Sequence, residues 1–413
     1  MHRRNALALT VIAALALASP ATAQQPPIKI GMSMPSTGGL AGGGKSSLIG
    51  IEIWRDDVNA RGGLLGRPVE LVVYDDKSSA SESPAIYSKL LDVDKVDILF
   101  APYATVQTAP IMPLVKQRGL LFMGNFSFQV NRTVQHDMWF NNAPWGPADS
   151  WSRAFIETGI KAGAKSIAIL AADQEFAQNV AKTAKAVAAE KGIQVVYEQN
   201  YPPNTVEFSA MMRAIRAAKP DMVFVGSYPP ESAGILRAVN EIGVGESVKI
   251  FGGGMVGLQF ASVMESLGSL MNGVVNYNSW LPEPSMQFPG TKEFFEKYGP
   301  RATAAKVDPL GYYLAPFGYA MGQMLEAAVT STKSLDQKGL AKYLRENEHK
   351  TIVGPIAFSA DGERKESATL LAQFRGVADK NIEQFRGPGK QVIMFPEKLK
   401  TGEVIVPFEK ARK

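Results

Sequence analysis

Hydrophobic positions fall into short apolar runs that alternate with longer amphipathic stretches. In the first part of the chain they predict alternately a strand and a helix, beginning with a strand, at 28–34, 47–60, 69–74, 82–91, 97–101, 107–117 and 120–123. Strands separated by helices of this length are typical of parallel βαβ units with right-handed crossovers.

The same alternation starts again further along the chain. A second series, again beginning with a strand, is predicted at 166–170, 175–191, 194–199, 208–218, 222–225, 232–242 and 249–251. Aromatic, proline-rich connections at 139–151 and 276–289 follow the two series, and later helices (310–330, 338–346) and strands (near 356–358 and 369–374) complete the pattern. A series that occurs twice predicts two similar α/β lobes.

Residues 1–23 have the pattern of a signal peptide. The basic segment His2 to Arg4 precedes an apolar run from Ala6 to Ala18, and Ala21-Thr22-Ala23 supplies the small residues of a cleavage site. The run is shorter than a membrane span of about 20 residues. We expect export to the periplasm without a membrane anchor; an uncleaved N-terminal helix is the alternative.

Composition narrows the class of protein. The chain has 413 residues, of which 46% are hydrophobic, and this length is enough for two domains. The formal charge of +5 falls by two, to +3, without Arg3 and Arg4, so no nucleic-acid-binding surface is indicated. Cysteine is absent, which excludes disulfides, thiolate metal sites, cysteine nucleophiles and a lipid-modified N-terminal cysteine.

The segment from Gly39 to Ser46 matches the phosphate-loop pattern G-x-x-x-x-G-K-S, between a predicted strand and a predicted helix. Two observations favour a glycine-rich turn without phosphate. Export would place the loop where ATP is scarce, and Ser33 with Pro35-Ser36-Thr37 lengthens the loop beyond a compact phosphate cradle. A nucleotide-dependent enzyme therefore remains only the weaker alternative.

Other patterns for catalysis or metal binding are not found. His136 and His349 lie far apart in the sequence, and no G-x-S-x-G elbow occurs. The acidic pairs Asp56-Asp57 and Asp75-Asp76 have no partner that would separate the pKa values of an acid and a base. We expect no catalytic activity, no metal and no cofactor.

Three stretches carry a resemblance to a known family. They are Ile28-Lys29-Ile30-Gly31 with Pro35-Ser36-Thr37-Gly38, the segment Asp57-Val58-Asn59-Ala60-Arg61-Gly62-Gly63-Leu64-Leu65-Gly66-Arg67-Pro68-Val69, and Val353-Gly354-Pro355-Ile356-Ala357-Phe358 with Asp361-Gly362. Together they resemble the type I periplasmic solute-binding proteins of the branched-chain (hydrophobic) amino acid ABC transporters.

The resemblance implies an α/β fold of two doubly wound parallel-sheet lobes, joined by three crossovers, with the ligand in the cleft between them. Lobe 1 would comprise 28–143 plus 277–353, and lobe 2 would comprise 144–276 plus 354–410. The implied function is capture of a small ligand by lobe closure and its delivery to a membrane permease, by a monomer. A sensory ligand-binding component with the same fold is the alternative.

The resemblance also implies which residues bind the ligand. The positions are Tyr103, Ala104, Thr105, Asn125, Phe126, Ser127, Phe128, Phe176, Tyr228, Gly254, Met255 and Tyr312. Thr105 would donate its hydroxyl to a ligand carboxylate, the loop 125–128 would offer backbone contacts, and Phe176 would cover the ligand. Tyr312 or Tyr313 would supply another aromatic wall.

Two departures from the family pattern bear on the ligand. No acid lies in the stretch from Gly252 to Met255, where a partner for an α-ammonium is expected, and Gly42-Gly43-Gly44 replaces an aromatic residue and would leave space. With Phe126, Phe128 and Trp145 nearby, these departures favour an aryl or hydrophobic carboxylate over an amino acid, because a buried ammonium needs a partner. Alternatively, Asp173 or Glu175 could pair with an ammonium.

Overall fold

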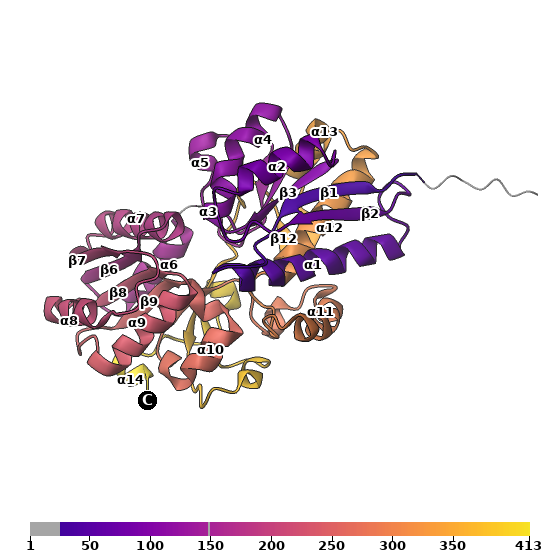
Figure 1. Ribbon diagram of the computed structural model, residues 1–413. Coiled ribbons are helices and arrows are strands. Elements are labelled where there is room, and N and C mark those ends of the chain that lie inside the picture. Colours follow the sequence, from indigo (N-terminus) through magenta and orange to yellow (C-terminus); the bar gives the residue numbers. More distant parts are fainter. Residues whose placement is uncertain (1–24, 148) are drawn as a thin grey trace, which may run out of the picture.

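The computed structural model describes residues 25–147 and 149–413, which form two α/β lobes side by side (Figure 1). The predicted signal peptide, 1–23, lies outside the described residues. In the described part of the chain, no helix is long and apolar enough to cross a membrane.

The first lobe is built on a parallel five-stranded sheet in the order β2-β1-β3-β4-β5. Its strands are β1 (Ile28–Ser33), β2 (Val69–Tyr74), β3 (Ile98–Tyr103), β4 (Phe122–Asn125) and β5 (Trp139–Asn141). Helices α1 (Ala41–Ala60) and α12 (Ala315–Thr332) pack on one face, while α2 (Ser83–Asp92) and α4 (Met112–Arg118) share a separate core cluster with the other face. Alternate residues of β3 divide between the two cores, as a sheet covered on both faces requires.

The second lobe contains a seven-stranded sheet in the order β14-β13-β10-β9-β8-β6-β7. Its strands are β6 (Ser166–Ala172), β7 (Gln194–Tyr201), β8 (Met222–Ser227), β9 (Ile250–Met255), β10 (Val275–Asn278), β13 (Leu370–Phe374) and β14 (Gln391–Phe395). Helices α6 (Ser150–Lys161) and α7 (Glu175–Glu190) cover one face, and α8 (Ser209–Ala218), α9 (Pro229–Ile242) and α10 (Ala261–Leu267) lie on the other (Figure 1). The α/β fold of two lobes with largely parallel sheets is confirmed, although β13 and β14 pair antiparallel.

The chain crosses between the lobes three times: from β5 to α6, from β10 to α11 (Thr291–Ala305), and from β12 (Gly354–Ile356) to β13. Strand β12 pairs with β11 (His349–Thr351), which follows α13 (Gln337–Glu346) and contacts α12 of the first lobe. The lobe limits remain a prediction, but strand pairing places the second and third crossings later than 276/277 and 353/354.

Several predicted elements differ from those observed. Helix α1 begins at Ala41, so the glycine-rich segment is largely helical rather than a loop. The predicted helix 107–117 is divided into α3 (Thr105–Thr108), a 3-10 turn and α4, because Pro110 and Pro113 each lack an N–H donor. The aromatic connection 139–151 was not expected to contain β5 or the start of α6.

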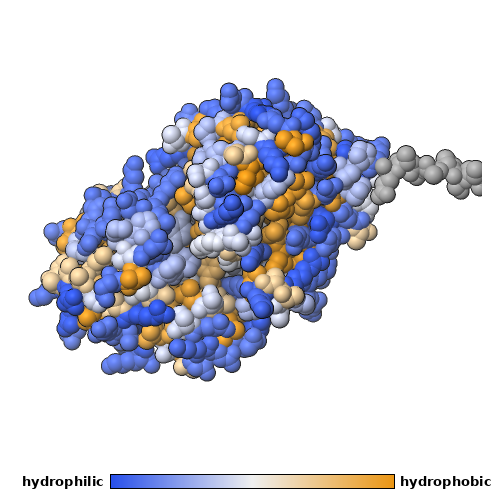
Figure 2. All heavy atoms as spheres, viewed as in Figure 1, coloured by the Kyte–Doolittle hydropathy of each residue, from blue (hydrophilic) through white to orange (hydrophobic). Residues whose placement is uncertain are grey.

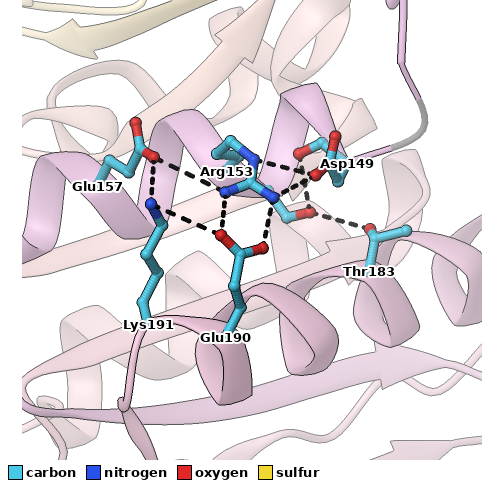
Figure 3. Close-up of polar contacts among 7 residues, drawn as sticks. Asp149, Arg153, Glu157, Thr183, Glu190 and Lys191 are labelled. Atoms are coloured by element: carbon cyan, nitrogen blue, oxygen red, sulfur yellow. Dashed lines mark hydrogen bonds and ion pairs between the residues drawn. The ribbon is translucent and has the colours of Figure 1, made fainter.

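An ionic network on the surface joins α6 to α7 (Figure 3). Arg153 donates to both carboxylate oxygens of Glu190 at 2.9 and 2.7 Å, and Lys191 lies 3.1 Å from Glu157. These bonds from Arg153 lower the pKa of the Glu190 carboxyl to about 2. The network orients the helix that follows the first crossing against α7, which carries Phe176.

Helices α1 and α12 approach each other closely through glycines. A Cβ atom on Gly50 would lie 2.0 Å from the Ala315 carbonyl oxygen, and one on Gly322 would lie 2.0 Å from Cδ2 of Trp54. Trp54 is fully buried and packs against Phe100 of β3. Any side chain at these glycines would therefore push the two helices apart.

We expect Gly322→Ala to lower the free energy of unfolding by about 1–3 kcal/mol, because an extra methyl group overpacks this seam. Gly387→Ala is the control, since no atom lies within 4 Å of its added Cβ, and a change within about 0.5 kcal/mol is expected there. Urea denaturation of both variants measures the difference. Equal midpoints would contradict the close helix contact.

Candidate functional site

A small cavity lies between the lobes, at the carboxyl ends of strands from both sheets. Its lining comes from both lobes and from two connecting segments: Tyr103, Ala104, Thr105, Phe126, Trp145, Phe176, Tyr228, Val256 and Tyr313. Ligands of open α/β sheets bind in this position, beyond the carboxyl ends of parallel strands.

Aromatic rings from the two lobes already fill most of this cavity. Phe126 lies edge-on to Trp145 and Tyr313, with ring centroids 5.0 Å apart in each pair, and Tyr313 lies 5.4 Å from Phe260. The remaining volume is about 10 Å³, which is room for about one water molecule. A larger ligand therefore enters only if the rings separate.

Six of the twelve predicted residues line this cavity: Tyr103, Ala104, Thr105, Phe126, Phe176 and Tyr228. Each lies at or just beyond the carboxyl end of a strand, or in the first turn of the helix that follows it. The resemblance to the family had pointed to these six positions, and they fall where the strand–helix alternation places the ends of strands.

The loop after β4 contributes less than predicted. Asn125 is fully buried and its Nδ2 donates to the Ser47 hydroxyl, while the Ser127 hydroxyl donates to Thr108 Oγ1 at 2.7 Å. Phe128 packs edge-on against Trp145 and faces a neighbouring cavity instead. Asn125 and Ser127 therefore hold the loop in place and do not line the central cavity.

Three further predicted residues lie away from the cavity lining. Met255 is fully buried and its N–H donates to Asn276 Oδ1 at 3.0 Å, and a Cβ on Gly254 would lie 3.0 Å from the Val225 carbonyl oxygen. Tyr312 packs on Trp280, with ring centroids 4.8 Å apart. Its neighbour in the sequence, Tyr313, lines the cavity instead.

The sequence had singled out Trp145 and Tyr313 as possible aromatic neighbours of the ligand, and both line the cavity. Nothing in the sequence marked Val256 as a lining residue, because it follows a glycine-rich strand and has an ordinary apolar side chain. Phe260 and Tyr277 were also missed; they contact Tyr313 from the second lobe, and only the tertiary structure brings them there.

Two non-glycine residues at the cavity have a left-handed backbone conformation. Ala104 has φ 85° and ψ 146°, and Phe126 has φ 60°. Such conformations cost free energy, and they are concentrated at ligand-binding positions where the surrounding structure enforces them. They occur here directly after the adjacent strands β3 and β4 of the first lobe, where the lobe meets the cleft.

The polar side-chain atoms of the lining residues are neutral: the hydroxyls of the tyrosines and of Thr105, and the indole N–H of Trp145. Thr105 Oγ1 accepts the N–H of Phe128 at 2.9 Å, which leaves the hydroxyl proton for another acceptor. Tyr277 donates to the hydroxyl of Tyr313 at 3.3 Å. Burial raises the pKa values of Tyr103, Tyr277 and Tyr313 well above the usual range, so these hydroxyls stay protonated at neutral pH.

No charged side chain is among the residues that line this cavity, within the part of the chain the structure describes. Asp173 and Glu175 are both exposed, and Glu175 lines a separate groove beside Arg132 and Lys182. The amino ends of α7 and α9 begin beside Phe176 and Tyr228, and helix amino ends carry partial positive charge.

The expectation that Gly42-Gly43-Gly44 leaves free space is wrong. A Cβ on Gly43 would lie 2.4 Å from Cε1 of Tyr103, and one on Gly44 would lie 2.0 Å from the Pro35 carbonyl oxygen. The glycines let the start of α1 approach the ring of Tyr103, which fills the space. They pack within a helix and do not form an open loop around a phosphate.

Comparisons with known proteins agree with this geometry. The periplasmic binding protein family matches residues 27–381. The Leu/Ile/Val-binding protein of Citrobacter freundii is 24% identical over 365 residues, which cover 88% of this chain and 95% of that protein.

Two solved structures share the fold. The leucine-binding protein from Thermotoga maritima superposes with a TM-score of 0.73 at 20% identity, covering 85% of this chain and 96% of that one. A solute-binding protein of an ABC transporter from R. palustris gives a TM-score of 0.71 at 18% identity, covering 89% and 95%. This chain belongs to the type I periplasmic binding proteins, in the leucine-binding family associated with branched-chain amino acid ABC transporters.

Proposed function

We propose that this protein captures a small aromatic or hydrophobic carboxylate in the periplasm and delivers it to the permease of an ABC importer. One observation carries the proposal: among the residues that the structure describes, the cavity between the lobes is lined by aromatic rings and neutral hydroxyl donors, and by no charged side chain. The function is binding and release, without a chemical step.

The absence of acids from this lining argues against an α-amino acid ligand. A buried ammonium requires a carboxylate partner, because desolvation of an unpaired charge costs several kcal/mol. A carboxylate, in contrast, is stabilised by hydroxyl donors and helix amino ends. The R. palustris neighbour was crystallised with benzoate, which supports an amine-free aryl acid as the ligand class.

Ligand entry requires the lobes to separate. The ring centroids of Phe128 in the first lobe and Phe176 in the second lie 6.0 Å apart, and the ring of Tyr313 contacts that of Phe260 across the cleft. Hinge motion about the three crossings would open these contacts, and an aromatic ligand would replace ring–ring contacts with ring–ligand contacts. The ligand thereby favours the closed arrangement to the extent that it binds that arrangement more tightly.

We expect benzoate and related amine-free aryl carboxylates to stabilise the refolded mature protein against heat, and leucine and phenylalanine to have little effect. A ligand at 100 times its dissociation constant adds about 2.7 kcal/mol of stability, so differential scanning fluorimetry detects it. Benzyl alcohol serves as the uncharged control. Stabilisation by leucine alone would contradict the argument from the missing acid.

We expect Tyr313→Phe to weaken binding of the stabilising aryl acid about tenfold, since loss of one hydrogen bond to a charged group corresponds to about 1.4 kcal/mol or more. Tyr312→Phe is a matched control, because Tyr312 packs on Trp280 outside the cavity. Isothermal titration calorimetry compares the two variants. Equal affinities would place the carboxylate away from the tyrosine hydroxyls.

A further inference from the structure

A second cavity lies beside the first and third crossings, next to Trp145. Its volume is about 330 Å³, far larger than that of the central cavity. Phe128 and Trp145 supply apolar walls, while Arg132, Arg364 and Lys365 supply three cationic groups. Trp145 thus lines two cavities: the central one, which is formed mainly by neutral groups, and this one, which contains cationic side chains.

Two residues that line this second cavity each carry a buried donor without a hydrogen-bond partner among the described residues. The donors are Nη1 of Arg364 and Nε1 of Trp145. Arg364 is 5% exposed and Trp145 is 3% exposed. Nη2 of Arg364 donates to the Pro355 carbonyl oxygen at 2.7 Å. Buried donors of this kind are nearly always satisfied, so a missing acceptor is indicated.

Arg364 also lacks an ion-pair partner, although the charge of Glu366 nearby acts to raise its pKa. Within the described part of the chain, no carboxylate lies within ion-pair distance of its guanidinium. Burial lowers the pKa of Arg364 to about 10, which still leaves it charged at neutral pH. An isolated buried cation is destabilising, and an anion beside it would remove that cost.

The two acids at this cavity do not cancel the positive charge. Glu363 accepts Trp139 Nε1 at 3.0 Å and Asn141 Nδ2 at 2.9 Å, and burial raises its pKa to about 8, so it is mostly neutral at pH 7. Asp361 Oδ1 accepts the Ser359 hydroxyl at 2.7 Å. The lining therefore carries three basic side chains and two acidic ones, of which Glu363 is mostly neutral.

The walls of this cavity are held together by the backbone. The N–H of Ala368 donates to the Pro144 carbonyl oxygen at 2.6 Å, and a Cβ on Gly146 would lie 2.6 Å from the Ser367 nitrogen. The first and third crossings thus run in direct contact here. Such contact fixes the Trp145 and Arg364 segments relative to each other without any ligand.

We propose that this cavity is a second binding site, which takes a compact oxyanion: a carboxylate or a phosphate. Arg364 Nη1 and Trp145 Nε1 are its donors, and Arg132 and Lys365 add positive charge at the rim. The site is separate from the central cavity and does not depend on which ligand that cavity binds.

Inorganic phosphate and acetate are the probes, and the indole N–H signals of the protein labelled with ¹⁵N-tryptophan are the readout. The chain has five tryptophans, and Trp145→Phe assigns the signal of Trp145. We expect one or both anions to shift that signal saturably, with phosphate and acetate distinguishing an inorganic ligand from an organic one. No saturable shift with either anion would overturn the proposal.

Four variants localise the site. We expect Arg364→Met to weaken binding of the anion about tenfold or more, since hydrogen bonds between charged groups are the strong ones. The double variant Arg132→Gln/Lys365→Gln should weaken binding severalfold. Lys338→Gln and the double variant Lys338→Gln/Lys342→Gln remove one and two positive charges from exposed residues of α13, so they match the two charge changes and should have no effect. If Arg364→Met does not fold, the double variant alone decides, and an unchanged affinity in it would overturn the proposal.

Discussion

Contact between aromatic rings of the two lobes is the interaction on which the closed arrangement depends. The ring centroid of Phe128, in the first lobe, lies 5.9 Å from that of Trp151 and 6.0 Å from that of Phe176, both in the second lobe. Aromatic pairs of this kind contribute about 0.5–1.5 kcal/mol each beyond the burial of their area. A single apolar cluster consequently continues from the core of one lobe to the core of the other.

Charges are placed so that this apolar contact stays neutral. The Arg153 network lies on the outer surface of α6 and α7, and Glu175 is exposed beside the cleft rather than within its lining. On the face shown in Figure 2, hydrophilic residues cover much of both lobes, and apolar residues gather beside α1. Burial of neutral hydroxyls in the cleft costs less desolvation free energy than burial of charged groups would. The hydroxyls can still donate hydrogen bonds to an anion.

Trp145 links the neutral cleft to the cationic cavity at the crossings. Its ring packs against Phe126, it lines both cavities, and its Nε1 has no hydrogen-bond partner among the described residues. The first and third crossings contact each other at Gly146, so the residues around Trp145 lie where the chain passes between the lobes. The two sites therefore share a wall while differing in charge.

The family resemblance pointed to residues at the ends of strands, such as Tyr103, Thr105 and Tyr228, and the sequence pattern by itself determined the strand–helix alternation and the two lobes. Local periodicity carries that information, because each apolar run and its end are adjacent in the chain. Only the tertiary structure decided between Tyr312 and Tyr313, because neighbouring residues of an irregular segment point to different surroundings. It also showed that Tyr103 fills the space at Gly43, and it joined Trp145 to Arg364. These outcomes depend on packing between segments far apart in the chain, which no local pattern records.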